Sequence, residues 1–100
     1  MNILKLNSGR VELRKDNGSL IRTLGNGDAI NADINDDCSL ILITTVRGKV
    51  ELRKENGSYI RAIGNGDATS ARFSGKDILV TTNKCKTELR KENGAFVRTI

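Results

Sequence analysis

The sequence contains no histidine. Hydrolytic triads of the serine and cysteine types need an imidazole as general base, so these triads and every histidine-ligated metal are excluded together. Cysteine is scarce as well, because only Cys38 and Cys85 occur, too few for a disulfide framework or a four-ligand zinc site. We expect two free thiols and no bound metal or cofactor.

Proline is also absent, and aromatic residues make up only 3% of the chain. Any hydrophobic core must therefore be built from isoleucine, leucine and valine, and the branched members of this set favour β-strands. Ten glycines are present, several of them directly after asparagine, and Asn-Gly pairs form tight hairpin turns. The composition thus predicts an all-β chain.

No stretch of the sequence has the apolar length of a membrane span, and residues 1–6 lack the long apolar core of a secretory signal peptide. We therefore expect a cytoplasmic protein without membrane contact. One hundred residues correspond to a single domain, which leaves much of its apolar surface near solvent unless a partner covers it. The net charge of +5 favours anionic partners, although many soluble domains are equally basic.

One sequence motif, Glu-Leu-Arg-Lys followed by Asn-Gly, occurs three times. Its arginines, Arg14, Arg53 and Arg90, are separated by 39 and then 37 residues. A second motif, Gly-Asn-Gly-Asp-Ala, stands between the copies at residues 25–29 and 64–68. The chain thus forms a single repeat domain with a partial first unit (1–24), a middle unit (25–63) and a last unit (64–100).

Each complete unit has the pattern of four short strands in an antiparallel meander. Residues 40–46 form the second strand of the middle unit and are apolar on both faces, which predicts cover from both sides. The first unit begins at the segment that aligns with a second strand, Ile3 to Leu6, so we expect eleven strands in all. In the last unit the strands are expected near residues 68–73, 78–82, 86–91 and 95–100.

The hairpin between the third and fourth strands determines which residues face each other. If residues 16–18 form a three-residue loop with Gly18 in the left-handed region, Lys15 faces Ser19. The same count predicts three glutamate–arginine pairs and two arginine–aromatic contacts, namely Glu12 with Arg22, Glu51 with Arg61, Glu88 with Arg98, Arg53 with Tyr59 and Arg90 with Phe96.

In the middle and last units, a polar turn, an aliphatic strand ending in Thr-Thr and a Glu-Leu-Arg-Lys strand follow one another in the same order. Residues 74–82, Ser-Gly-Lys-Asp-Ile-Leu-Val-Thr-Thr, look like the first turn and second strand of a WD40-like β-propeller blade, and residues 51–54 occupy the place of its third strand. The resemblance covers nearly the whole chain, but the Trp-Asp and Gly-His pairs of that family are absent, so it is architectural only. The compact repeats are also similar to small propeller-like proteins encoded by bacteriophages.

The resemblance implies about 2.75 blades, fewer than the roughly four to eight with which propellers close. Homo-oligomerisation would cover the exposed faces and strand edges of the terminal units, and two chains, giving six blades, are the favoured solution. The first unit would still lack an inner strand unless residues 1–6 supply it. The alternative is a monomeric open β-sandwich of degenerate repeats.

The distribution of charge defines one candidate binding face. In a four-stranded unit, the turns between the second and third strands lie at the same end as the loops that join successive units. This end is basic, and its Gly-Asn-Gly loops offer main-chain amides for an anion, although exposed turns are often lysine-rich for solubility alone. The residues of this predicted face are Arg10, Arg47, Lys49, Lys84, Lys86, Asn26, Asp28, Asn65 and Asp67.

We interpret the chain as a non-enzymatic binding or assembly module, because a carboxylate that recurs in every unit indicates a scaffold contact rather than a catalytic group. A first alternative is capture of an anionic ligand, a nucleic acid or a nucleotide, by a phage counter-defence factor. A second is a repeat lectin, but a sugar site in each unit needs an aromatic platform and the first unit has Leu20 at that position. Residues 33–37 are acidic, but they lack the glycine and glutamate of a calcium loop, so we expect a solvated loop.

Overall fold

The computed structural model describes residues 2–25 and 27–100, in which eleven strands are present, as the repeat predicted. They form one three-stranded and two four-stranded antiparallel sheets, one for each unit. No helix among the described residues is long and apolar enough to span a membrane.

The first sheet contains β1 (Asn2–Asn7), β2 (Arg10–Lys15) and β3 (Leu20–Leu24). The middle sheet contains β4 (Ala29–Ile34), β5 (Leu40–Thr45), β6 (Val50–Lys54) and β7 (Tyr59–Ile63). The last sheet contains β8 (Ala68–Ser74), β9 (Asp77–Thr82), β10 (Thr87–Lys91) and β11 (Phe96–Thr99).

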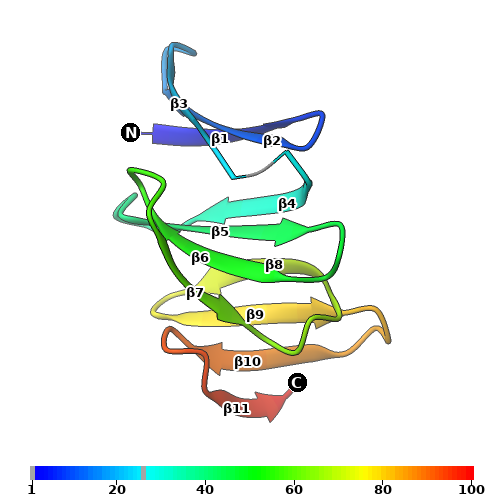
Figure 1. Cartoon of the computed structure of the whole chain (residues 1–100). Helices are drawn as coiled ribbons and strands as arrows, with labels where there is room; N and C mark the ends of the chain where they lie inside the picture. The colour runs from blue at the N-terminus through cyan, green and yellow to red at the C-terminus, as the bar shows by residue number, and fades with distance from the viewer. Residues whose placement is uncertain (1, 26) are drawn as a thin grey trace.

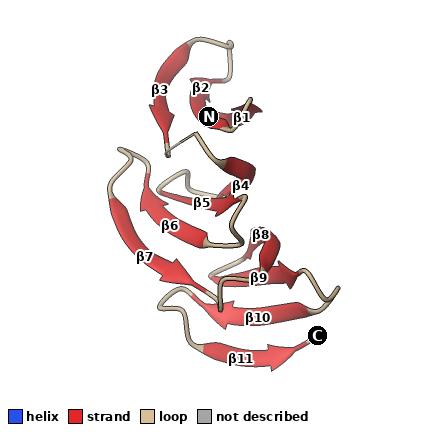
Figure 2. Cartoon of the chain, turned by 45° about the vertical axis from the view of Figure 1, so that its right-hand side comes forward, coloured by secondary structure: helices blue, strands red, loops and turns tan. Residues whose placement is uncertain are grey.

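The three sheets follow one another through an elongated molecule that measures 38 × 25 × 20 Å (Figure 1). Each sheet is a meander, and a short loop leads from its outer strand to the inner strand of the next sheet. Figure 2 shows the sheets as successive splayed layers. The first and last sheets therefore each have one face that contacts the middle sheet and one face that no described residue covers.

Two hydrophobic clusters lie between the sheets, and β5 contributes to both. Ile41 and Ile43 belong to the cluster shared with the first sheet, whereas Leu42 belongs to the cluster shared with the last sheet. Successive side chains of a strand point to opposite faces, which explains this division. The prediction of cover on both sides is confirmed for β5, while Val46 lies beyond the strand and is exposed.

The hairpins between the third and fourth strands have the predicted three-residue loop. The Lys15 N–H donates to the Ser19 carbonyl at 2.9 Å, and Gly18 has a φ of 92°. Gly57 and Gly94 adopt the same left-handed conformation in the other two hairpins, with φ values of 95° and 93°. Only glycine takes this conformation without steric cost, which is why the Asn-Gly pair recurs.

The predicted glutamate–arginine pairs across these hairpins are wrong, because the pairing shifts by one residue inside each hairpin. In the first sheet Glu12 faces Thr23, and Arg22 faces Leu13. The bulge brings Leu24 into the core, where it is 3% exposed, and burial of a leucine outweighs an exposed ion pair. The same shift separates Glu51 from Arg61 and Glu88 from Arg98.

Each glutamate instead pairs with the arginine two residues along its own strand. Arg53 Nη2 lies 2.9 Å from Glu51 Oε1, and Arg53 Nη1 donates to the Gly57 carbonyl at 2.8 Å. The guanidinium also lies 5.7 Å from the centre of the Tyr59 ring, so the predicted stacking is confirmed. One arginine thus holds two strands and their loop together. The contacts recur as Arg14–Glu12 at 2.8 Å, Arg90–Glu88 at 3.0 Å and Arg90–Phe96 at 5.4 Å.

Candidate functional site

The turns between the second and third strands and the loops between sheets meet at one end of the molecule, the loop end, whose described residues are 8–9, 25, 27–28, 46–48, 64–67 and 83–85. The Ala29 N–H donates to the Gly9 carbonyl at 3.0 Å, and the Val46 N–H donates to the Asp28 carbonyl at 2.8 Å. Two bonds of the same kind recur one unit later, from Ala68 to Gly48 at 3.0 Å and from Asn83 to Asp67 at 2.8 Å. The structure therefore fixes the loops against the turns.

Two glycines allow this close approach. A Cβ atom on Gly9 would lie 2.2 Å from the Gly27 carbonyl oxygen, and one on Gly48 would lie 2.4 Å from the Gly66 oxygen. Both distances are far below van der Waals contact, and both glycines also have left-handed φ values. Cys85 takes the equivalent position in the turn of the last unit, with a φ of 62°.

Arg10 lines an open depression at the loop end. The space measures about 540 Å³ and lies beside the loop that leads to the middle sheet. No carboxylate is among its described lining residues, so the positive charge of Arg10 is not offset within the depression. The lining residues are Ser8, Arg10, Thr23, Gly25 and Gly27.

Two of the predicted basic residues contribute less to this face. Arg47 shares a smaller depression, of about 200 Å³, with Asp67, which offsets its charge locally. Lys49 is directed away from the loop end, because its Nζ lies 5.6 Å from the centre of the Tyr59 ring, and Tyr59 begins the strand that follows the opposite turn. Sequence position alone did not reveal these side-chain directions.

The remaining predicted residues have different environments. Lys84 and Lys86 are exposed on either side of Cys85 in the last turn. Asp28 and Asp67 hold the turns through their main-chain carbonyls, and no hydrogen bond to either carboxylate is formed within the described residues. Asn65 is exposed, and Asn26 lies outside the described residues.

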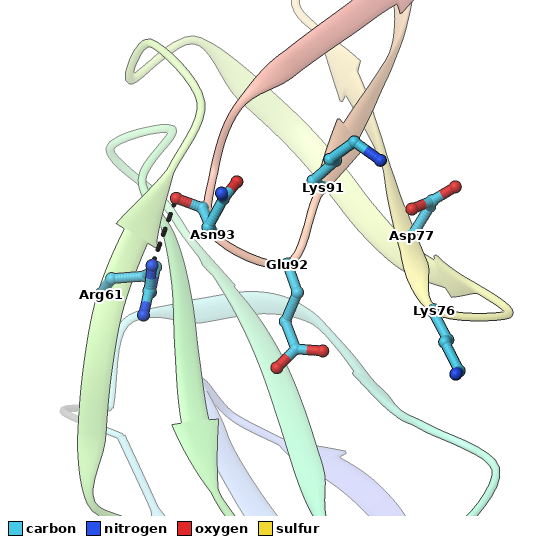
Figure 3. A pocket seen from close by; sticks show the side chains of 6 residues that line it. All are labelled: Arg61, Lys76, Asp77, Lys91, Glu92 and Asn93. Carbon is cyan, nitrogen blue, oxygen red and sulfur yellow. Dashed lines mark hydrogen bonds between the residues drawn. The ribbon is translucent and has the colours of Figure 1, made fainter.

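The end opposite the loop end carries a depression that the sequence did not predict (Figure 3). It measures about 390 Å³ and lies where the middle and last sheets meet, at a point where the Arg61 Nη1 donates to the Asn93 carbonyl at 3.3 Å. Its charged side chains are of mixed sign and come from segments distant in sequence, so only the packing of the sheets brings them together. The lining residues are Arg61, Lys76, Asp77, Lys91, Glu92 and Asn93.

The acidic stretch 33–37 is not a simple solvated loop. Asp33 belongs to β4, and its Oδ2 accepts a hydrogen bond from the Phe73 N–H of the neighbouring inner strand at 2.8 Å. The Ser39 hydroxyl and amide donate to Asp37 Oδ1 and hold the pKa of that carboxyl below its ordinary value. The carboxylates of Asp33 and Asp37 thus serve the packing of the inner strands and the shape of a turn.

The ion pair of the first sheet also lowers the pKa of its carboxyl group. The Arg14 guanidinium donates two hydrogen bonds to Glu12 Oε1 and, against the opposing effect of burial, lowers the pKa of that carboxyl. The charge of Lys5, which faces Glu12 across β1 and β2, acts in the same direction. Glu12 is thereby held as a structural carboxylate.

Similarity searches support the architecture. No protein-family model matches the sequence, and no curated protein matches it. The crystal structure of BamB from Moraxella catarrhalis is similar with a TM-score of 0.75 and 24% identity, over 98% of this chain and 32% of that chain. The crystal structure of RRP9 WD40 repeats has a TM-score of 0.82 and 8% identity, over 99% of this chain and 34% of that chain. The three units are β-propeller blades.

The blades span about a third of the length of either of these two proteins. At such low identity the likeness establishes the fold alone, and the WD40-like resemblance of the sequence is confirmed at that level. The similarity to phage-encoded proteins stays a prediction. In this fold the loop end is formed by equivalent turns of three successive blades.

Proposed function

We propose that the chain is a non-enzymatic binding and assembly module whose blades present the loop end to an acidic protein surface. The observation that carries the proposal is a set of three exposed cations, Arg10, Lys84 and Lys86. None of them forms an ion pair within the described residues, whereas Arg14, Arg53 and Arg90 each pair with a glutamate. Unpaired charges on a rigid end face attract a partner of opposite charge and orient it.

The aromatic side chains favour a protein partner over a nucleic acid. Tyr59 lies against both Lys49 and Arg53, and Phe96 lies against Arg90, so these rings are engaged by the chain's own cations. Both rings also follow the turn opposite the loop end. Proteins that bind single strands stack bases on free aromatic rings, and a loop end without such rings is poorly suited to this task.

Charge reversal tests the proposal. We expect the wild-type chain to bind poly-L-glutamate with an affinity that falls steeply with salt, and an Arg10→Glu/Lys84→Glu/Lys86→Glu variant to lose roughly tenfold or more in affinity. A Lys15→Glu/Lys54→Glu/Lys91→Glu variant has the same net charge but alters the opposite turns, and it should retain most of the binding.

Fluorescence anisotropy with labelled poly-L-glutamate and labelled oligothymidylate gives both affinities. Equal losses in the two variants would show that net charge alone governs binding and would overturn the assignment to the loop end. Binding of oligothymidylate but not of poly-L-glutamate would replace the acidic protein with a nucleic acid.

A further inference from the structure

The two interfaces between blades share one directional contact. Arg22 of the first blade donates from Nη1 to the Asn56 carbonyl of the middle blade at 3.4 Å, and Arg61 of the middle blade donates to the Asn93 carbonyl of the last blade at 3.3 Å. Each blade thus offers an arginine forward and a turn carbonyl backward. Among the described residues, Arg98 of the last blade has no such carbonyl, and the Asn17 carbonyl of the first blade has no such arginine.

The uncovered face of the last blade is apolar at positions that the middle blade buries. Leu79 faces Leu89 as Leu42 faces Leu52, and both members of the latter pair are at most 1% exposed. Leu79 and Leu89 are only half-buried, and Ile100 is 70% exposed. The uncovered face of the last blade, defined by Leu79, Thr87, Leu89 and Ile100, is therefore built like an interface.

The uncovered face of the first blade, defined by Ile3, Lys5, Glu12 and Arg14, is built like the opposing half. Ile3 faces Arg14 as Ile41 faces Arg53 in the middle blade. Ile41 is fully buried against the preceding blade, whereas Ile3 is 45% exposed. The Glu12–Arg14 ion pair likewise repeats a pair that the middle and last blades turn toward the blade before them.

Each uncovered face has one polar residue at a position where the other blades have an aliphatic residue. These two positions are partners across the interfaces between blades. Lys5 stands where the other blades have Ile43 and Val80, and Thr87 stands where they have Val11 and Val50. Val11 and Ile43 belong to one buried cluster, and Val50 and Val80 belong to the other. If the two uncovered faces met, Lys5 and Thr87 would occupy partner positions, where the ammonium group can donate to the hydroxyl.

The side chain of Cys85 restricts which blade can pack against the last one. A side chain at Gly9 or Gly48 would collide with the Gly-Asn-Gly-Asp loop of the next blade, and Cys85 has such a side chain. A blade that brings this loop therefore cannot dock on the last blade in the way the internal blades dock. The first blade, as the structure describes it from β1 to β3, brings no such loop.

We propose that the uncovered face of the last blade binds the uncovered face of the first blade in a second copy of this chain, with Arg98 of one copy donating to the Asn17 carbonyl of the other. The proposal deepens the assembly part of the proposed function and does not depend on anion binding at the loop end. The contact is head-to-tail, so a pair of copies makes it twice and closes a ring. Six blades lie within the range in which propellers close.

Two single substitutions and their mixture test this contact. Leu89→Arg places a charge on the face of the last blade, and Ile3→Arg places one on the face of the first blade. Each variant alone should lose dimerisation in sedimentation velocity, because every contact would include a damaged face. A mixture of the two should recover dimers, because one contact joins an intact first blade to an intact last blade. Val46→Arg, at an exposed position in a turn of the middle blade and outside both faces, serves as the control for added charge and should remain dimeric.

A wild-type chain that sediments as a monomer at every concentration would overturn the proposal, as would dimerisation of either variant alone or a mixture that stays monomeric. Circular dichroism and urea unfolding verify that each variant is folded. The sedimentation experiment contains no anionic probe, so it tests dimerisation alone. Binding of poly-L-glutamate to the loop end is measured separately, whether the chain is a monomer or a dimer, so the two proposals can fail independently.

Discussion

At the scale of single residues, the recurring arginine of the third strand holds each blade together. Arg53 contacts a glutamate, a loop carbonyl and an aromatic ring, and Glu51 beside it is only 6% exposed. A buried carboxylate that loses its cation is costly, because neither water nor another donor replaces the lost interaction. The recurring glutamate–arginine pair of the repeat is therefore structural.

Removal of this arginine should destabilise the middle blade. We expect Arg53→Met to lower the free energy of unfolding by roughly 2 to 4 kcal/mol, because Glu51 and the Gly57 carbonyl both lose their donor. Arg14→Met should cost less, since the Arg14 side chain is 27% exposed in the first blade and the Arg53 side chain 14%. Urea denaturation of both variants measures the difference, and equal losses would contradict the role assigned to burial.

The lowered pKa of Glu12 predicts how the stability of the fold changes at acidic pH. A carboxyl whose pKa is lower in the folded chain than its ordinary value of 4.5 stabilises the fold fully above that value, and the contribution is lost as pH falls through the lower, folded value. Urea midpoints measured between about pH 6 and pH 3 should therefore fall for the wild type and fall less for Glu12→Gln. An identical decline in both proteins would show that Glu12 is not held by Arg14.

At the scale of elements, the sequence predicted the strands and the hairpin loops but not the bulges. The Asn-Gly pair predicted the loop, and the apolar side chains on both faces of β5 predicted cover from both sides. The charge pairing of Glu12 with Arg22 was a poor guide to register, because burial of Leu24 decides where the pairing shifts. The direction of Lys49 and the depression around Arg61 depend on packing between segments distant in sequence, so no local pattern indicated them.

The close approach of turn and loop gives a prediction at this scale. Gly48→Ala should destabilise the chain by roughly 3 kcal/mol or more, because the added methyl group would meet the Gly66 oxygen at 2.4 Å in addition to the strain of a left-handed φ. Gly66→Ala has a similar φ but no atom within 4 Å of the new methyl group, so roughly 1 kcal/mol is expected. Thermal unfolding compares the two, and similar shifts would argue against the contact.

At the scale of the whole molecule, three blades expose two unlike faces. The two interfaces between blades bury positions whose equivalents on the outer faces of the terminal blades are uncovered. These equivalents are Ile3 at one end and Leu79 and Ile100 at the other. Exposed aliphatic sheet faces promote association. The directional arginine contacts between blades are the pattern on which the proposed head-to-tail association of like chains is based.

The mass of the assembled particle tests the central claim most directly, that these blades complete a ring with a second copy. Native mass spectrometry of the wild-type chain should show a species of twice the 10.9 kDa chain mass that persists on dilution. A closed ring makes two contacts per pair, so larger species should not accumulate as the concentration rises. A particle of 10.9 kDa at all concentrations, or a continuous ladder of larger masses, would contradict the account.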